Sequence, residues 1–383
     1  MPLDPDGQFL GALRRGLGEG ASAADVARQV REHSPAAGTA ELLDSISVVA
    51  SEVIGAGPLE RLLAEPGVSD VLVNGAGPVW IDRGRGPERT DVVLPDEASV
   101  RRLAQRLVTA CGRRLDDAQP FADARLADGT RLHAVLPPLA SHGTHLSLRL
   151  PPRRSFTLDE LVAARSLTPP AAELLGELVE SRLAFVVTGG TGTGKTTILS
   201  TLLSLVDPTE RIVLVEDASE LRPQHPHVVR LESRLPNAEG AGGVDLSDLV
   251  RQALRMRPDR LVVGEVRGRE VVDLLAAMNT GHEGGCSTVH ANRAEHVPAR
   301  FEALGSAAGL PRQAVHSQLA AAVDAVVHLR RDRNGARRVC GIAVLVVRPD
   351  GLVDAVTASA FRADGVTRGP GAEELQRRLA MRV

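Results

Sequence analysis

Residues 183–199 read LAFVVTGGTGTGKTTIL, and this stretch decides the fold. An apolar run that is typical of a buried strand leads into a glycine-rich loop, and a helix-forming run follows it. The loop fits the pattern GxxxxGK[ST], with Gly189, Gly194, Lys195 and Thr196 at its fixed positions. In a strand–loop–helix setting, this spacing predicts a loop that binds the phosphates of a nucleoside triphosphate.

The chemistry of the loop follows from its residue types. Glycines allow backbone N–H groups to turn inward around phosphate oxygens, and the N-terminus of the next helix adds about half a positive charge. We expect Lys195 to reach the β- and γ-phosphates and the Thr196 hydroxyl to ligate Mg²⁺. The predicted binding set is Gly189, Gly190, Thr191, Gly192, Thr193, Gly194, Lys195, Thr196 and Thr197.

Lys195 is the only lysine in a chain that has 45 Lys and Arg residues. Because the chain otherwise uses Arg as its cation, position 195 is predicted to need a compact ammonium group that a planar guanidinium cannot replace. The same scarcity excludes the Asn-Lys-x-Asp segment with which GTPases read guanine.

The composition of the 383 residues limits the classes of function. Aromatic residues make up 2% of the chain, so its cores must be aliphatic, and the base-stacking platforms of nucleic-acid binders are scarce. The net charge of −3 also differs from the positive charge that is typical of nucleic-acid-binding proteins. We therefore predict no direct contact with nucleic acid.

The cysteines and the termini indicate the compartment. Cys111, Cys286 and Cys340 are too far apart for a disulfide framework or a metal site, which fits a reducing cytosol. The opening MPLDPDGQFL lacks the apolar core of a signal peptide, and no run reaches the roughly 18 apolar residues of a membrane span. These features predict a cytoplasmic protein that touches a membrane only through partners.

The composition and the hydrophobic pattern of the sequence change along the chain, and these changes predict its domains. Residues 1–55 are expected to form a helical extension, and residues 56–150 a small α+β domain. The segment PPRRS at 151–155 is predicted to be a linker, because its prolines and arginines are typical of a domain boundary. From 156 to 383, strand and helix patterns alternate, which predicts a parallel sheet with helices on both faces.

Two local patterns are specific enough to be tested. The segment 97–113 has apolar residues at helical spacing, and these predict one buried face. The face is formed by Val100, Leu103, Leu107 and Val108. Near the end of the chain, residues 326–347 read as a hairpin with Asn334-Gly335 at its turn.

Three later segments supply polar groups that can act beside a phosphate loop. IVLVEDASEL places Glu216 at a strand end, and RLVVGEVRG places Glu265 at another, in the pattern of a Walker B carboxylate. Either carboxylate can hold Mg²⁺ or act as base toward the attacking water, and both assignments stay open.

The third segment, TGHEGGCSTVHAN, carries His282 and His290. The two histidines are eight residues apart with no Cys or acidic ligand at metal spacing, so they do not indicate a zinc site. We expect His290 to hydrogen-bond a neighbour of the γ-phosphate and to report its loss.

Taken in order, four segments resemble the Walker A, Asp box, Walker B and His box of the type II/IV secretion ATPase family. They are GGTGTGKTT, VEDASEL, LRMRPDRLVVGEVRGRE and TGHEGGCSTVHAN. Within that family the chain is most similar to the TadA/CpaF-type ATPases of tight-adherence (Flp) pili. The likeness covers roughly residues 55 to 350. Cys286 and Arg293 depart from the usual His box, but neither removes a candidate group.

The resemblance implies a RecA-like P-loop ATPase domain that uses ATP and Mg²⁺, preceded by the α+β domain and the helical extension. It also implies a ring, usually a hexamer, with nucleotide between the two domains and Arg side chains reaching the phosphates. Such an Arg stabilises the charge of phosphoryl transfer and can raise rates by about 10³–10⁵-fold. By motif position the candidates are Arg131, Arg149, Arg230, Arg255 and Arg267.

The predicted function is Mg²⁺-dependent ATP hydrolysis, with Lys195, Glu216, Glu265 and His290 as the central groups. Hydrolysis would power pilus assembly, or secretion of pilin-like substrates, through an inner-membrane platform protein. A conjugation-type DNA-transfer motor and a nucleotide-binding scaffold without turnover are the alternatives. The acidity of the chain counts against direct DNA contact, and the intact acid and histidine set counts against the scaffold.

Overall fold

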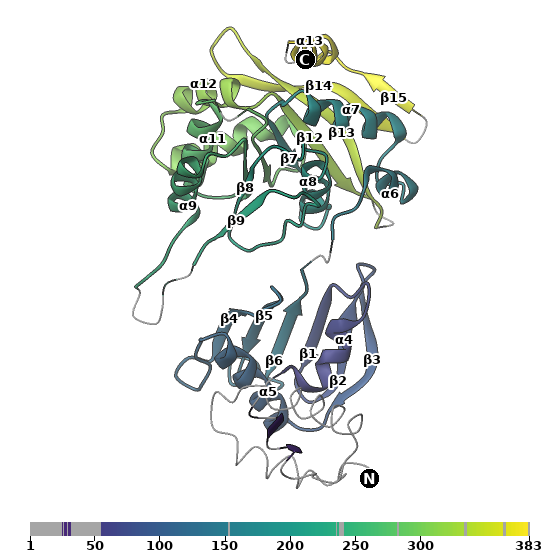
Figure 1. Cartoon of the computed structure of the whole chain (residues 1–383), viewed down its shortest axis with the longest axis vertical. Coiled ribbons are helices and arrows are strands. Elements are labelled where there is room, and N and C mark those ends of the chain that lie inside the picture. The colour runs from purple at the N-terminus through teal and green to yellow at the C-terminus, as the bar shows by residue number, and fades with distance from the viewer. Residues whose placement is uncertain are drawn as a thin grey trace. The chain divides into compact units, whose positions relative to one another are not determined.

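The computed structural model describes residues 55–381, apart from 152–153, 235, 237–240, 282, 333–334 and 363–364, and a few residues between 25 and 31. Most of the extension predicted over 1–55 lies outside the described residues, as do His282 and Asn334. The few residues described between 25 and 31 are helical. Contacts divide the chain into two compact units, Met1–Pro151 and Pro152–Val383 (Figure 1). The predicted domain bounds and the linker over 151–155 stay predictions.

The first unit is built on a six-stranded antiparallel sheet with the order β3-β2-β1-β6-β5-β4. Its strands are β1 (Asp70–Asn74), β2 (Gly77–Asp82), β3 (Pro87–Leu94), β4 (Phe121–Arg125), β5 (Arg131–Val135) and β6 (His145–Arg149). The short helices η1 (Gly57–Leu59) and α4 (Glu60–Ala64) precede the sheet, and α5 (Glu97–Ala110) follows β3.

Helix α5 supplies much of the core of this unit. It begins where the Asp96 side chain accepts a hydrogen bond from the Ser99 backbone N–H at 2.7 Å, which satisfies one of the free donors of the first turn. The predicted face is confirmed, because all four of its apolar residues are buried. They pack with alternate residues of the strands, such as Val71 and Leu132, in one hydrophobic cluster.

The second unit is built on a nine-stranded sheet with the order β15-β14-β13-β12-β7-β11-β10-β8-β9. The six strands from β12 to β9 are parallel to one another. They are β7 (Phe185–Thr188), β8 (Ile212–Glu216), β9 (Val228–Glu232), β10 (Arg260–Val266), β11 (Cys286–Val289) and β12 (Ala325–Arg331). The other three are antiparallel: β13 (Arg337–Val347), β14 (Val353–Arg362) and β15 (Gly365–Arg368).

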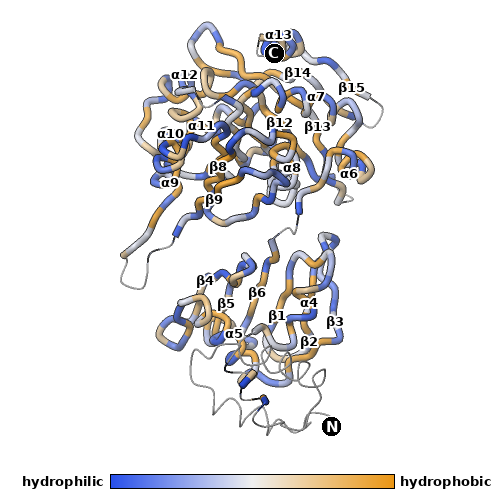
Figure 2. Tube along the Cα trace, in the orientation of Figure 1, coloured by the Kyte–Doolittle hydropathy of each residue, from blue (hydrophilic) through white to orange (hydrophobic). Residues whose placement is uncertain are grey.

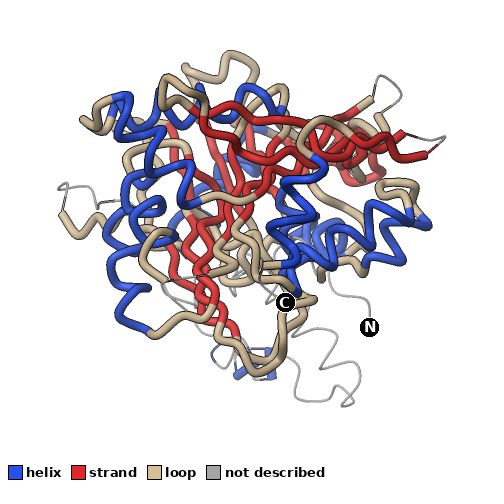
Figure 3. The backbone as a smooth tube through the Cα atoms, turned by 90° about the horizontal axis from the view of Figure 1, so that it is seen from above, coloured by secondary structure: helices blue, strands red, loops and turns tan. Residues whose placement is uncertain are grey.

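Helices cover both faces of this sheet, as the sequence predicts (Figure 3). One face packs against α9 (Leu246–Ala253), α10 (Glu270–Met278), α11 (Val297–Ala307) and α12 (Arg312–Ala322). The other packs against α6 (Leu158–Ala163), α7 (Pro169–Glu180), α8 (Lys195–Leu203) and α13 (Ala372–Ala380). Short 3-10 turns η2 (Leu254–Met256) and η3 (Ala294–His296) complete the unit.

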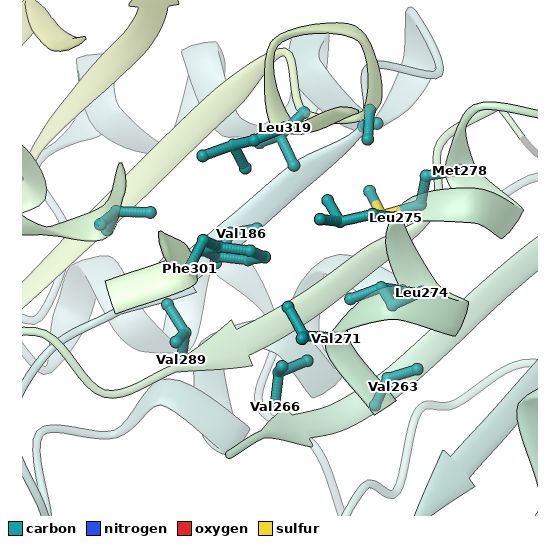
Figure 4. Close-up of a cluster of buried hydrophobic side chains, with 14 of the residues drawn as sticks. Val186, Val263, Val266, Val271, Leu274, Leu275, Met278, Val289, Phe301 and Leu319 are labelled. Atoms are coloured by element: carbon teal, nitrogen blue, oxygen red, sulfur yellow. The ribbon is translucent and has the colours of Figure 1, made fainter. Parts of the chain in front are cut away.

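Strand β8 shows why this sheet needs two layers of helices. Its five residues are all buried, and the tube is hydrophobic along it in Figure 2. Ile212 and Leu214 enter one core cluster, whereas Val213 and Val215 enter the other. Because successive strand residues point to opposite faces, such a continuous apolar run must be covered on both sides. Figure 4 shows one of these clusters, in which Val186 and Val263 of the strands lie near Leu274 and Leu275 of α10.

The C-terminal part extends the sheet further than the sequence predicts. The expected hairpin is present, since β12 and β13 pair in antiparallel register from Ala325↔Val344 to Arg331↔Arg337. Strands β14 and β15 were not predicted, and they make this edge of the sheet antiparallel. Among the described residues, no helix has the length and apolar character needed to cross a bilayer.

Candidate active site

The glycine loop predicted to bind phosphate joins β7 to α8 in the second unit. Gly192 and Gly194 have φ values of 70° and 95°, in the left-handed region that other residues disfavour. A methyl group on Gly189 would lie 2.6 Å from the main-chain oxygen of Leu329, so no larger residue fits there. The glycines therefore permit a tight loop at the N-terminus of α8, where unpaired N–H groups are available to an anion.

The Lys195 side chain lies inside this loop and is 7% exposed. Its Nζ donates to the main-chain oxygens of Gly189 and Gly190, at 3.2 and 3.1 Å. It also lies 3.4 Å from both ring nitrogens of His290. Burial lowers the pKa of Lys195, and the nearby Glu265 carboxylate opposes that shift. The loop thus holds an ammonium group whose present partners are weak neutral acceptors, which an anionic ligand can replace.

The threonines of the loop divide into structural and accessible groups. Thr193 is buried and donates to the main-chain oxygen of Gly190 at 2.9 Å, which stabilises the turn. Thr191 is exposed at the crest of the loop. Thr196 and Thr197 are half-buried in the first turn of α8. The Thr196 hydroxyl therefore belongs to the same helix end as Lys195.

Glu265 and His290 meet beside Lys195. Glu265 lies near the end of β10 and His290 directly follows β11, and these strands are parallel neighbours. The carboxyl ends of parallel strands share one edge of a sheet, where ligands of such folds bind. His290 Nε2 is 2.5 Å from Glu265 Oε1. Burial and then the Lys195 charge lower the pKa of His290, while Glu265 opposes them.

Arg267 extends this group on the far side of Glu265. Its Nη2 lies 3.2 Å from Glu265 Oε2 and 3.1 Å from Asp217 Oδ2. The Glu270 carboxylate accepts hydrogen bonds from the backbone N–H groups of Arg267 and Gly268, at 2.7 and 2.8 Å. The start of α10 thereby fixes the backbone from which Arg267 reaches the two acids. Glu265 is held between an imidazole and a guanidinium.

Glu216 has a different environment from Glu265. It ends β8, is 4% exposed, and its Oε1 accepts hydrogen bonds from the backbone N–H groups of Glu220 and Leu221 at 2.9 and 3.0 Å. A methyl group on Gly264 would lie 2.8 Å from Glu216 Cγ, so this side chain fills the space beside β10. Burial raises the pKa of Glu216, and the two backbone hydrogen bonds oppose the shift. Its contacts order the segment that follows β8.

Ser200 of α8 and Ser204, the residue that caps the C-terminal end of α8, contact the same segment, and no sequence motif predicts either of them. Ser200 Oγ accepts a hydrogen bond from the backbone N–H of Arg222 at 3.0 Å, and Ser204 Oγ accepts one from Gln224 at 2.9 Å. These bonds attach the connection between β8 and β9 to the helix that follows the phosphate loop. No motif marks such serines, because their importance depends on which segment the fold places against α8.

The structure brings only some of the predicted arginines to this edge. Arg230, in β9, is near Glu216 and Arg222, and burial is the main cause of its lowered pKa. Arg255, in η2, instead donates to the Gln252 side chain at 3.2 Å. Arg267 is thus the predicted arginine in direct contact with Glu265.

Arg131 and Arg149 belong to the first unit. They lie directly opposite each other on the antiparallel strands β5 and β6. Arg149 Nε is 3.6 Å from Asp70 Oδ1, on the next strand of the sheet. Like charges at directly opposed positions destabilise a sheet, and Asp70 lies beside Arg149 as an opposite charge. The sequence predicted both residues, but not that they form a cross-strand pair.

The fold and these contacts define a class of protein. A parallel α/β sheet with a glycine loop, a buried lysine in the loop and an acid on a nearby parallel strand is the arrangement of P-loop nucleotide-binding proteins. A family model described as type II/IV secretion system protein matches residues 52–374. The chain belongs to the type II/IV secretion system protein family. The predicted family and fold class are confirmed.

Known proteins of this kind are similar over most of the chain. A putative conjugal transfer protein of Mycobacterium tuberculosis is 56% identical over 326 residues, covering 84% of this chain and 92% of that protein. Conjugal transfer protein TrbB of Rhizobium radiobacter is 31% identical over 275 residues, covering 70% and 81%. The crystal structure of the pilus retraction motor PilT with bound ADP has a TM-score of 0.53 and 19% identity, covering 84% and 88%, and supports the fold.

Proposed function

We propose that the chain hydrolyses ATP in a Mg²⁺-dependent reaction at the edge of the sheet formed by β7, β10 and β11. The observation that carries this proposal is the contact of Lys195, His290 and Glu265, which come from three separate segments. A cation inside a phosphate loop and an acid beside it are the two groups that phosphoryl transfer to water requires.

The loop fits a triphosphate and its metal ion. Gly189 leaves space that a side chain would fill, and the buried Lys195 ammonium contacts two main-chain oxygens and an imidazole. The Thr196 hydroxyl would ligate Mg²⁺, and Glu265 would hold the ion through a bound water. When bound, the ion would neutralise charge on the phosphate oxygens.

Glu265 is the acid that we assign to the attacking water. His290 and Arg267 hold its two oxygens, one each, and leave it close to Lys195. A carboxylate in this position can accept a proton from a water that attacks the γ-phosphorus, while the bond from that phosphorus to the β–γ bridging oxygen breaks and ADP leaves. His290 would orient Glu265 and respond when the phosphate beside Lys195 leaves.

We assign Glu216 a positioning role. Its Oε1 already accepts two backbone hydrogen bonds, and its carbon chain packs on Gly264. It would keep the segment after β8 in place, including Asp217, which contacts Arg267. The sequence leaves open which of Glu216 and Glu265 is the base, and we propose that it is Glu265.

The arginines are proposed to act in two groups. Arg267 and Arg230 would stabilise charge from within the same subunit, and Arg131 and Arg149 would approach the phosphates from the N-terminal domain. Their cross-strand position would present two guanidinium groups to one anion. Arg255, whose described contact is with Gln252, would act only across a contact with another subunit. A hexameric ring in the cytoplasm, docked on an inner-membrane platform protein, would supply such contacts.

The work done by hydrolysis is proposed to be pilus assembly or secretion of pilin-like substrates. The similarity of four motifs to the TadA/CpaF type supports this assignment. The names of the relatives, a putative conjugal transfer protein and TrbB, support conjugal transfer equally well. The net charge of −3 favours a motor that moves protein and does not itself bind DNA.

Phosphate release by the purified full chain with ATP and Mg²⁺ tests the enzymatic part. We expect turnover in the wild type and its loss in Lys195→Ala, with the circular dichroism spectrum unchanged. Glu373→Gln, at an exposed position of α13, is the control and should keep wild-type turnover. Binding of ATP without phosphate release by the wild type, even at concentrations that form a ring, would favour the scaffold instead.

A binding assay separates the two kinds of motor. The chain, with ATP and Mg²⁺, would be mixed with labelled single- and double-stranded DNA at physiological salt. We expect no retention of either DNA at micromolar protein. Tight, salt-sensitive binding would favour the DNA-transfer motor.

A further inference from the structure

The hairpin of β12 and β13 lies directly against the phosphate loop. The main-chain oxygen of Leu329 would be 2.6 Å from a methyl group on Gly189, and Leu329 Cδ2 would be 3.9 Å from one on Gly194. Strand β12 is also the parallel neighbour of β7, which leads into the loop. The side chains at the end of this hairpin are therefore placed at the loop by the sheet itself.

Two arginines at the end of the hairpin face the loop. The register pairs Arg331 directly with Arg337. Arg331 Nη1 would lie 3.9 Å from a methyl group on Gly192, and Arg337 Cδ would lie 3.8 Å from one on Gly194. Two guanidinium-bearing side chains thus lie beside consecutive turns of the same loop, from adjacent strands.

The neighbouring arginine pair behaves differently. Arg330 and Arg338 form the preceding cross-strand pair, and both contact the Asp332 carboxylate, at 3.2 and 3.4 Å. Within the part of the chain that the structure describes, the side chains of Arg331 and Arg337 have no hydrogen bond or ion pair, and both residues are exposed. Directly opposed like charges cost stability in a sheet. Among the described residues, the Arg330–Arg338 pair has a carboxylate partner, whereas the Arg331–Arg337 pair has none.

The side of the loop on which this pair lies indicates what it would contact. In the sheet order, β7 separates β12 from β11 and β10. Glu265 and His290 lie on the β11 and β10 side, where the γ-phosphate would react. The arginine pair lies on the opposite side, so an extended triphosphate in the loop would direct its other end toward the hairpin.

We propose that Arg331 and Arg337 form an anion subsite that binds the nucleotide's phosphate chain at its α-phosphate end. This inference rests on the proposed function only in taking a nucleotide as the ligand. Guanidinium groups bind phosphate oxygens through charge-assisted hydrogen bonds, which are stronger than those between neutral groups. The pair would neutralise the end of the phosphate chain that Lys195 does not reach.

The test is a calorimetric titration of the full chain with ADP and Mg²⁺, which requires no turnover. Arg331→Ala and Arg337→Ala are each expected to raise the Kd about tenfold. Arg330→Ala, on the same strand but paired with Asp332, is the matched control and should stay within about twofold. Because each variant in the pair removes a like-charge repulsion, the melting temperature of the nucleotide-free protein should not fall.

Arg331→Lys distinguishes a phosphate contact from stacking on the base. It keeps the charge, so we expect it to recover most of the lost affinity at low salt, and the wild-type Kd should rise with salt more steeply than that of Arg331→Ala. The proposal is overturned if the alanine variants bind ADP like the wild type, or if Arg331→Lys is as weak as Arg331→Ala. If the wild type binds ADP but does not hydrolyse ATP, the proposed function is wrong and the anion subsite is unaffected. If the wild type binds no ADP, both the proposed function and the anion subsite are wrong.

Discussion

Glu265 is the residue at which the charges of the candidate site meet. One of its oxygens contacts His290 and the other contacts Arg267. The buried Lys195 lies close enough for its charge to interact with that of Glu265. These contacts fix the position of the Glu265 carboxylate, which a base that acts on a bound water requires. Glu216 is also ionisable, but its environment favours the protonated form.

Replacing Glu265 with Gln should separate binding from chemistry. The amide keeps the size of the side chain but cannot accept the proton of water, so we expect phosphate release to fall at least 100-fold. Affinity for ADP should change by less than about threefold, because the loop and Lys195 are untouched. Phosphate release and calorimetry would be measured on the same preparation. Retention of more than a tenth of wild-type turnover would remove Glu265 as the base.

Glu216→Gln should stabilise the protein, and the gain should depend on pH. Burial raises the pKa of Glu216, so ionising it costs the folded state more than the unfolded one. The stability that the protonated Glu216 gives to the folded state is fully present below the ordinary pKa of Glu. It is lost as the pH rises through the raised pKa of the folded state. The Gln oxygen can still accept from Glu220 and Leu221. We expect a higher melting temperature than wild type at pH 7.5 and a smaller difference at pH 4.5. A gain that is equal at both pH values would contradict this account.

At the scale of elements, the site depends on close contact between β8 and β10. Gly264→Ala should push Glu216 aside and cost about 1–3 kcal/mol, as overpacking does. Gly176→Ala is its control, since a methyl group there meets no atom within 4 Å and α7 should gain up to about 1 kcal/mol from the better helix former. Urea unfolding measures both. Equal effects of the two variants would show that the contact with Glu216 carries no strain.

The elements that the sequence predicts are those with a strong local pattern. Strands β7, β8 and β10 are continuous apolar runs, and α5 has a clear amphipathic period, so local rules suffice. Strand β3 begins with Pro87 and has exposed residues over most of its length, and β9 is an edge strand with no fully buried residue. Neither has the period that identifies a strand, because its place depends on the neighbour that it pairs with.

Some residues of the candidate site could also be predicted from local sequence patterns, and others could not. Lys195, Glu265 and His290 could be predicted, because each lies in a motif whose strand or loop context is readable. The pairing of Arg331 with Arg337 depends on a hairpin register that includes an irregularity between His328 and Leu329. In a chain with so many arginines, spacing alone does not separate these two from Arg330 and Arg338. Only the contacts with Asp332 and with the loop glycines do so.

At the scale of the whole molecule, the proposed ring makes a prediction about mixed assemblies. If neighbours hydrolyse ATP in turn and share arginines across subunit contacts, one inactive subunit should impair more than its own site. Lys195→Ala would be mixed with wild type at constant total concentration, after incubation that allows exchange, and phosphate release measured against the wild-type fraction. We expect activity to fall faster than that fraction, to clearly below half at a one-to-one mixture. Dilution of the wild type with buffer to the same concentrations is the control for dissociation. A linear decrease would mean that each subunit acts independently and would contradict sequential firing.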